Sequence, residues 1–222
     1  MGSYYLNRSD MSDRQRLPAE ERKALIIRAV TALCGEHNPA RVTMAAIAER
    51  MGVTQGALFR HFPSKATIWE AVVDWASGQL LRRADQAIEA ADSPTDALEQ
   101  LFLTHVDFIV HHPGVPRLIL GELQHPEPTP ARQMAQALLR KYRQRLQTLL
   151  QAGCRAGLLR PDLDIEAAAT QFIGAIQGLV LQALISGDMR QAATVAPRVF
   201  ALYLQGIATP HAPKVDPPEA RP

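Results

Sequence analysis

The sequence predicts an all-α protein in which a small three-helix head precedes a larger helical body, with about nine helices in all. Composition is the first reason: 47% of the 222 residues are hydrophobic, but only 5% are aromatic. Runs of Ala, Leu, Gln and Arg are common, whereas strings of Val, Ile and Thr are rare, which favours helix over sheet. Helical spacing of apolar residues is the second reason, as in Ile26, Val30 and Leu33. Proline and glycine at the ends of such segments are the third.

The head is expected to contain one long helix followed by two short ones. Pro18 suits the first turn of a helix that runs to Glu36. Thr43 caps the first short helix, which runs to about Arg50. Thr54 caps the second, at about 55–61.

The rest of the chain divides at serine, proline and glycine. Ser64 caps a connecting helix that runs to about Arg83, and the sequence Asp92-Ser93-Pro94 marks the next boundary. Further helices are expected at 95–111, 117–123, 131–156, 165–186 and 193–205.

The segment 42–65, VTMAAIAERMGVTQGALFRHFPSK, carries the clearest motif. It places two short helices about three residues apart, with Gly52 in the turn, which is the helix-turn-helix plan. Ala48 is small where the second helix must cross closely, and Gly52 can adopt the left-handed conformation. Apolar residues stand where the two helices bury each other: Ile47, Val53 and Leu58. An ordinary antiparallel helix pair meets the same demands, so the spacing alone is moderately specific.

Two residues of this segment favour DNA as the partner. Gly56 lies inside the second helix, where glycine costs about 1 kcal/mol relative to alanine; close approach to a DNA groove would explain it, and a poorly formed helix start is the alternative. Lys65 lies in the first turn of the next helix, where a cation is unfavourable unless an anion such as a phosphate is bound there. A solvated surface charge is the alternative for Lys65.

Residues 24–73 resemble the DNA-binding domain of the TetR family of transcription regulators. The matching residues are Ala29, Leu33, Thr43, Ile47-Ala48, Gly52-Val53-Thr54, Gly56-Ala57-Leu58-Phe59, His61-Phe62 and Ser64-Lys65. The resemblance implies a dimeric regulator, by default a repressor, that leaves its operator when a small effector binds. It also implies a division into a flexible arm (1–17), a DNA-binding domain (18–63), a connecting helix (64–84), a ligand-binding and dimerisation domain (85–207) and a disordered tail (208–222).

The resemblance further implies that helix 55–61 is the recognition helix in the major groove. Base contacts are expected from Gln55 and Gly56, and Arg60 on the same helix is suited to guanine. Phosphate contacts are expected from Thr43, Thr54, Ala57, His61 and Lys65. Phe59 stands where the family usually has tyrosine, so the hydroxyl that would bond a phosphate is missing.

Helix 165–186 is the expected dimer interface, together with helix 193–205. It is apolar almost all round, so one face can pack on its own subunit while the other needs a second partner. The residues expected at this interface are Gly174, Gly178, Val199 and Leu202. A two-fold homodimer also suits a palindromic DNA operator.

An effector pocket is expected in the body, as the resemblance implies. Its expected lining is Trp75, Phe102, His105, Phe108, Ile109, Leu118, Phe172 and Ile176. Such a lining, with only His105 and Gln177 to orient a ligand, favours an apolar or aromatic molecule. For each residue singly, an ordinary place in the core is the alternative.

Other functions have weaker support. The net charge of +2 excludes little, and the histidines at 105, 111, 112 and 125 lack the spacing of a metal site. No nucleophile–base pair, phosphate loop or cofactor motif is present, which leaves an all-helical enzyme, or an adaptor without DNA binding, as the alternative. Residues 167–186 are long enough to cross a membrane but carry three glutamines. We expect a cytoplasmic protein with no catalytic residue, metal or cofactor, and with Cys34 and Cys154 as buried thiols.

Overall fold

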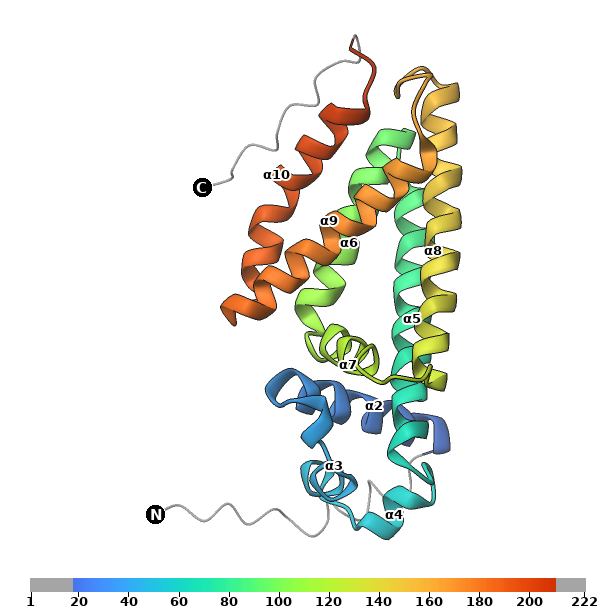
Figure 1. The fold of residues 1–222 in the computed structure, drawn as a ribbon. Helices are drawn as coiled ribbons and strands as arrows, with labels where there is room; N and C mark the ends of the chain where they lie inside the picture. The colour runs from blue at the N-terminus through green and yellow to red at the C-terminus, as the bar shows by residue number, and fades with distance from the viewer. Residues whose placement is uncertain (1–17, 211–222) are drawn as a thin grey trace. The chain divides into compact units, whose positions relative to one another are not determined.

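The structure, a computed structural model, describes residues 18–210, and within that range it confirms an all-α fold. Figure 1 shows the helices in chain order. They are α2 (Ala19–Glu36), the 3-10 helix η1 (Pro39–Arg41), α3 (Met44–Met51), α4 (Gln55–Phe59), α5 (Lys65–Ala90), α6 (Pro94–His111), α7 (Gly114–Glu122), α8 (Pro130–Arg155), α9 (Ile165–Ser186) and α10 (Arg190–Ile207). The expected arm, and the expected tail from residue 211 onward, lie outside the described residues.

The expected start and stop signals of the two short helices are present. The Thr43 hydroxyl accepts a hydrogen bond from the N–H of Ala46 at 3.1 Å, and that of Thr54 from the N–H of Ala57 at 3.2 Å. Gly52 ends α3 in the left-handed conformation, with φ 67°. Because these signals act over three or four residues, the sequence alone was sufficient to locate both helices.

Several helix bounds differ from those expected. The helix α5 runs to Ala90 instead of Arg83 because no breaker precedes the boundary at residues 92–94. The helix α4 is shorter than expected and ends at Phe59. The helix α7 begins before Pro116, since a proline in a first turn loses no helical hydrogen bond.

Contacts divide the described residues into two units. The first comprises 18–79 and 111–138, and the second comprises 80–110 and 139–210. The first unit thus contains, besides the residues of the expected head, the first part of α5, α7 and the start of α8. The second unit continues past α10, where Leu159 and Ala208 form an isolated antiparallel bridge.

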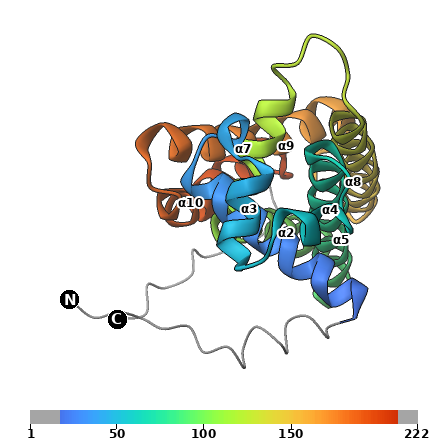
Figure 2. The same cartoon turned by 90° about the horizontal axis from the view of Figure 1, so that it is seen from below.

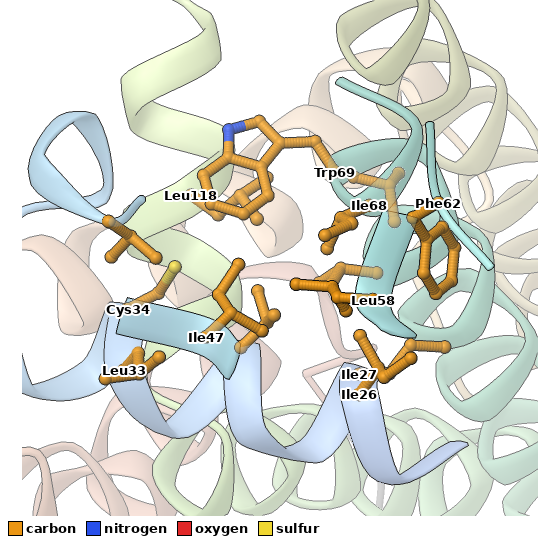
Figure 3. Close-up of a cluster of buried hydrophobic side chains, with 14 of the residues drawn as sticks. Ile26, Ile27, Leu33, Cys34, Ile47, Leu58, Phe62, Ile68, Trp69 and Leu118 are labelled. Carbon is orange, nitrogen blue, oxygen red and sulfur yellow. The ribbon is translucent and has the colours of Figure 1, made fainter. Parts of the chain in front are cut away.

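The core of the first unit lies between α2, α3, α4, α5 and α7. Figure 3 shows its side chains, among them Ile26, Leu33, Ile47, Leu58, Ile68 and Leu118. The helix α7 approaches α2 closely at Gly114, where an added Cβ would lie 1.9 Å from the carbonyl oxygen of Thr31. This approach needs glycine, and it lets Leu118 join the core with 1% of its surface exposed. In both views α3 lies beside α2, and α4 follows it (Figures 1 and 2).

Aromatic side chains fill the core of the second unit. The ring of Phe102 on α6 lies 5.2 Å from that of Phe172 on α9 and 5.6 Å from that of Phe200 on α10. The hydroxyl of Tyr203 donates to the carbonyl oxygen of Ala168 at 3.1 Å, which ties α10 to α9. Such pairs contribute beyond the area they bury, so they fix how these helices pack.

The helix α9 has the length and mean hydropathy, 1.5, of a membrane span. One side of the helix, which includes Phe172 and Ile176, is buried inside the second unit, whereas Leu181 and Ile185 are exposed. The three glutamines, at 171, 177 and 182, are exposed. The buried side is that of a helix packed in the core of a folded domain.

Candidate functional site

The helices α3 and α4 form the expected helix-turn-helix. Ile47 and Leu58 are almost fully buried where the two helices meet. The turn between them is closed by a hydrogen bond from the N–H of Val53 to the carbonyl oxygen of Ala48 at 3.0 Å. The buried face of α4 fixes the helix to the core, and its other face is turned to solvent.

The exposed face of α4 carries the expected base-reading residues. Gln55, Gly56 and Arg60 are all exposed, as is Phe59, which has 45% of its surface accessible. A Cβ added at Gly56 would have its nearest contact at 4.0 Å, with the hydroxyl of Thr54. Packing among residues 18–210 therefore does not require glycine at this position.

Thr43 and Thr54 begin the two helices of the motif, and both are exposed. Each hydroxyl oxygen already accepts a backbone N–H as a helix cap. A capping hydroxyl keeps its own proton, which it can donate to an acceptor such as a phosphate oxygen. One hydroxyl can therefore cap the helix and contact a phosphate at the same time. A substitution that tests the phosphate contact must keep the helix cap.

His61 follows α4 and is held by an arginine of α2. The Nη1 of Arg22 lies 3.1 Å from the Nε2 of His61. Because guanidinium groups only donate, Nε2 is the acceptor, and the neutral ring carries its proton on Nδ1. Burial and then the charge of Arg22 lower the pKa of His61. His61 thus keeps an N–H donor, and Arg22, 39 positions earlier, is a positioning residue that no local sequence pattern reveals.

Lys65 has internal partners that the sequence did not indicate. Its ammonium group donates to the carbonyl oxygens of Pro39 at 2.9 Å and Ala40 at 3.2 Å, and it lies 4.8 Å from the ring centre of Trp69. Partial burial lowers its pKa. Lys65 therefore ties η1 to the start of α5, and among the described residues its third proton has no acceptor. Ala57, the remaining expected phosphate contact, is half-buried on α4.

The expected pocket residues fall in both units. Phe102, Phe108, Phe172 and Ile176 are buried in the second unit, where His105 and Ile109 also lie. Trp75 and Leu118 belong to the first unit, and Leu118 is part of its core (Figure 3). The ring of Trp75 meets that of His112 edge-on at 5.0 Å. Six of the eight residues thus share one unit.

Gln177 is exposed on α9, away from the buried side of that helix. The expectation that it orients a ligand inside the body is not supported by this position. Its place on the helix explains this, because Ile173, Ile176 and Val180 take the buried side.

The expected dimer residues lie on exposed faces of α9 and α10, which run side by side (Figures 1 and 2). A Cβ added at Gly174 or Gly178 would meet nothing within 4 Å. On the same face of α9, Leu181 and Ile185 are exposed, the latter by 78%. On α10, Leu202 is 70% exposed. Val195 and Val199 lie beside it along a shallow surface depression. We call this set of residues the α9–α10 face.

Metal and thiol chemistry find little support in the structure. Within residues 18–210, no three histidine, cysteine, aspartate or glutamate side chains are grouped to hold a metal ion. Cys34 is buried, and burial raises the pKa of its thiol to about 11. The expectation that Cys154 is also buried is wrong: it is half-buried, because it lies near the end of α8, where its thiol donates to the carbonyl oxygen of Arg160 at 3.4 Å.

Comparisons with known proteins agree with this geometry. Residues 26–72 match the model of bacterial regulatory proteins of the tetR family, and residues 122–199 match the tetracyclin repressor-like C-terminal domain. A nucleoid occlusion factor SlmA of Alteromonas mediterranea is 31% identical over 147 residues, 66% of this chain and 73% of that protein.

Solved structures share the fold. FadR of Bacillus subtilis, crystallised with stearoyl-CoA, is 21% identical with a TM-score of 0.72, over 83% of this chain and 98% of that one. SmeT, the repressor of the Stenotrophomonas maltophilia multidrug efflux pump SmeDEF, is 20% identical with a TM-score of 0.69, over 94% of this chain and 100% of that one.

Proposed function

Because the chain belongs to the TetR family and is a DNA-binding transcription regulator, we propose that it is a cytoplasmic repressor that binds a palindromic operator as a homodimer and leaves it when a small effector binds. The observation that carries the proposal is the exposed face of α4. That face holds Gly56, which packing among the described residues does not require, next to Gln55, which can read bases, and one residue beyond Gln55 from the capping hydroxyl of Thr54.

In this proposal α4 enters the major groove of DNA. Gln55 at its first turn is suited to a bidentate contact with adenine, and Arg60 at its end to guanine. Gly56 allows the backbone to approach the base edges. Reading of sequence therefore rests on these three residues, all of them exposed.

Phosphate contacts fix the head on the duplex in this proposal. The hydroxyls of Thr43 and Thr54 and the Nδ1–H of His61 supply neutral donors, and Lys65 supplies its remaining proton. Such contacts position a protein without reading sequence. Ala57 is half-buried on α4, and its methyl side chain has no hydrogen-bond donor to offer a phosphate.

The α9–α10 face supports a homodimer. TetR-family regulators bind DNA and effectors as dimers. Here the large apolar side chains of Leu181, Ile185 and Leu202 are exposed, and Gly174 and Gly178 permit close approach of a second helix. Two helices from each subunit would form a four-helix interface about a two-fold axis. A dimer of this kind presents two recognition helices to a palindromic site.

The second unit is the proposed effector site. FadR and SmeT show that this fold occurs in a protein crystallised with stearoyl-CoA and in the repressor of an efflux pump. In this chain the buried aromatic side chains of Phe102 and Phe172 suit an apolar or aromatic molecule. Release requires the effector to favour the conformation that does not bind DNA, with a coupling on the order of 1–3 kcal/mol.

A pair of variants at Thr54 tests the DNA interface. Thr54→Asp and Thr54→Asn both keep a good helix cap, so both should fold. Only the aspartate places a negative charge where a phosphate is proposed. We expect Thr54→Asp to lose at least about tenfold in affinity for the DNA upstream of its own gene, and Thr54→Asn to lose much less. Equal affinities of the two folded variants in a fluorescence anisotropy titration would show that no phosphate lies there.

Nucleoid occlusion is a second candidate function, because the Alteromonas mediterranea relative is a nucleoid occlusion factor at 31% identity. The two candidates share DNA binding and differ in its consequence. A repressor lowers transcription of the gene beside its binding site. We expect deletion of this chain's gene to raise that transcript in an RNA sequencing experiment, and unchanged transcripts beside every binding site would favour nucleoid occlusion.

A further inference from the structure

His105 and Tyr142 are two polar side chains in the second unit that touch each other. His105 lies on α6 and Tyr142 on α8, and their ring centres are 5.0 Å apart with the planes at 67°. Tyr142 is 2% exposed, and the Nδ1 atom of His105 is closed to solvent. Within the described residues, neither this nitrogen nor the hydroxyl of Tyr142 has a hydrogen-bond partner. The edge-on contact thus brings the two rings together without joining their polar atoms.

Tyr203 shows how a buried tyrosine is accommodated elsewhere in the same unit. Its hydroxyl donates to the carbonyl oxygen of Ala168 at 3.1 Å. Nearly all buried polar groups in native proteins are paired in this way, because an unpaired one loses its hydration without compensation. Two unpaired groups in ring contact are therefore a cost that the fold itself does not recover. A partner outside the chain would recover it.

Buried apolar residues flank the pair on both of its helices. Phe102 and Ile109 lie one turn before and after His105 on α6, and Leu146 lies one turn after Tyr142 on α8; all three are buried. Burial lowers the pKa of His105 to about 4 and raises that of Tyr142, so both rings are neutral at neutral pH. A charged ligand group would lose its hydration here without a counter-ion, which is unfavourable. A neutral polar group fits.

We propose that His105 and Tyr142 form a subsite that recognises the hydroxyl group of an otherwise apolar effector, an alcohol or a phenol. The proposal rests on the effector-controlled repression proposed above and assigns the chemistry of its ligand. A hydroxyl donates to the imidazole nitrogen and accepts from the tyrosine hydroxyl, so it satisfies both atoms at once. An ether cannot donate, and a carboxylate only accepts and is charged.

The test compares 2-naphthol with its methyl ether, 2-methoxynaphthalene, and with 2-naphthoate, each titrated calorimetrically into the purified full chain. We expect 2-naphthol to bind at least about tenfold more tightly than the other two, the equivalent of one net hydrogen bond. We expect Tyr142→Phe to lose that preference and to leave the affinity for the ether unchanged. Equal affinities for naphthol and ether, or no binding of naphthol at millimolar concentration, would overturn the subsite.

Tyr203→Phe is the matched control, since it removes a buried hydroxyl that has a partner. We expect it to lower the melting temperature and to keep the preference for 2-naphthol. Tyr142→Phe should keep or raise the melting temperature, because the lost hydroxyl was unpaired. An equal fall in the melting temperature of both variants would show that the hydroxyl of Tyr142 is already bonded, for example to buried water. That result would overturn the proposal. DNA binding of the wild-type chain is measured in parallel: its absence refutes the repressor, whereas intact DNA binding without a naphthol preference refutes only the subsite.

Discussion

Gly114→Ala should strongly destabilise the first unit, because it forces α7 away from α2. The new Cβ would lie 1.9 Å from the carbonyl oxygen of Thr31, whereas such atoms are essentially never closer than 3.0 Å. Both groups belong to helix backbones, so no side-chain rotation relieves the clash, and α7 must retreat by at least about 1 Å. A gap of that size forfeits about a quarter to a half of the dispersion energy at the contact.

The residues that α7 buries set the magnitude of this effect. Val115 and Leu118 are 5% and 1% exposed. Full burial of such side chains contributes about 1.5–3 kcal/mol each. Loss of a large part of this stabilisation from buried side chains should lower the free energy of unfolding by about 3 kcal/mol. That is a substantial share of the 5–15 kcal/mol typical of a domain.

Urea denaturation followed by tryptophan fluorescence measures this change directly. The chain has two tryptophans, Trp69 and Trp75, and both belong to the first unit. Gly121→Ala is the matched control on the same helix, because its Cβ would lie at an ordinary 4.0 Å from Pro39. We expect the control to be neutral or slightly stabilising. A Gly114→Ala variant within about 1 kcal/mol of the wild type would refute the close approach of α7 to α2.

Three further predictions concern assembly, pH and DNA reading. Gly178→Arg should fold, since its Cβ meets nothing within 4 Å, but should sediment as a monomer that binds DNA poorly; a dimer at micromolar concentration would contradict this. The folded pKa of His105, about 4, lies below its ordinary 6.5, so the unfolded chain takes up a proton on this ring more readily than the folded chain does. Through this group the free energy of unfolding is therefore highest above pH 6.5 and decreases as the pH falls toward 4. The part of the slope that His105 contributes, at most about 1.4 kcal/mol per pH unit, should be missing in urea titrations of His105→Leu. An unchanged slope would refute the assignment. Gln55→Ala should relax the preference for one base at one operator position. Lys65→Ala should instead weaken binding to all DNA sequences, lower the salt dependence of DNA affinity by about one unit of slope and also reduce stability. A Lys65→Ala variant with the wild-type salt slope would exclude the phosphate contact.

The sequence was sufficient for features that depend on neighbouring residues. Thr43 and Thr54 were identified as caps because a cap acts within a single turn. Gly52 was assigned to the turn for the same reason, since only its own backbone angles decide the matter. The helix-turn-helix and the exposed face of α4 were therefore predictable from local sequence alone.

Contacts between distant residues were not predictable in this way. Arg22 and His61 are 39 positions apart, and Lys65 reaches carbonyl groups 25 and 26 positions earlier. The place of α7 in the first unit depends on Gly114 meeting α2, which no local pattern reveals. The sequence did hold one signal, however: the short segment at 117–123 is apolar, and its Leu118 needed a core to join.

The unpaired atoms of His105 and Tyr142 are also a feature that depends on residues far apart in the sequence. The sequence placed His105 among the pocket residues but gave no reason to include Tyr142, which lies 37 positions later on another helix. Whether a buried polar atom has a partner depends on the packed structure of several helices. This property appears only when their side chains are placed.

Selection of bound sequences from random double-stranded DNA by the purified chain is the most direct test of the central claim, that a dimer reads an operator with α4. The enriched sequences should share a two-fold symmetric motif, with half-sites about 10 base pairs, or a multiple of this, apart, since each recognition helix occupies one major groove. No enriched motif, or a single asymmetric half-site bound by the dimer, would contradict it.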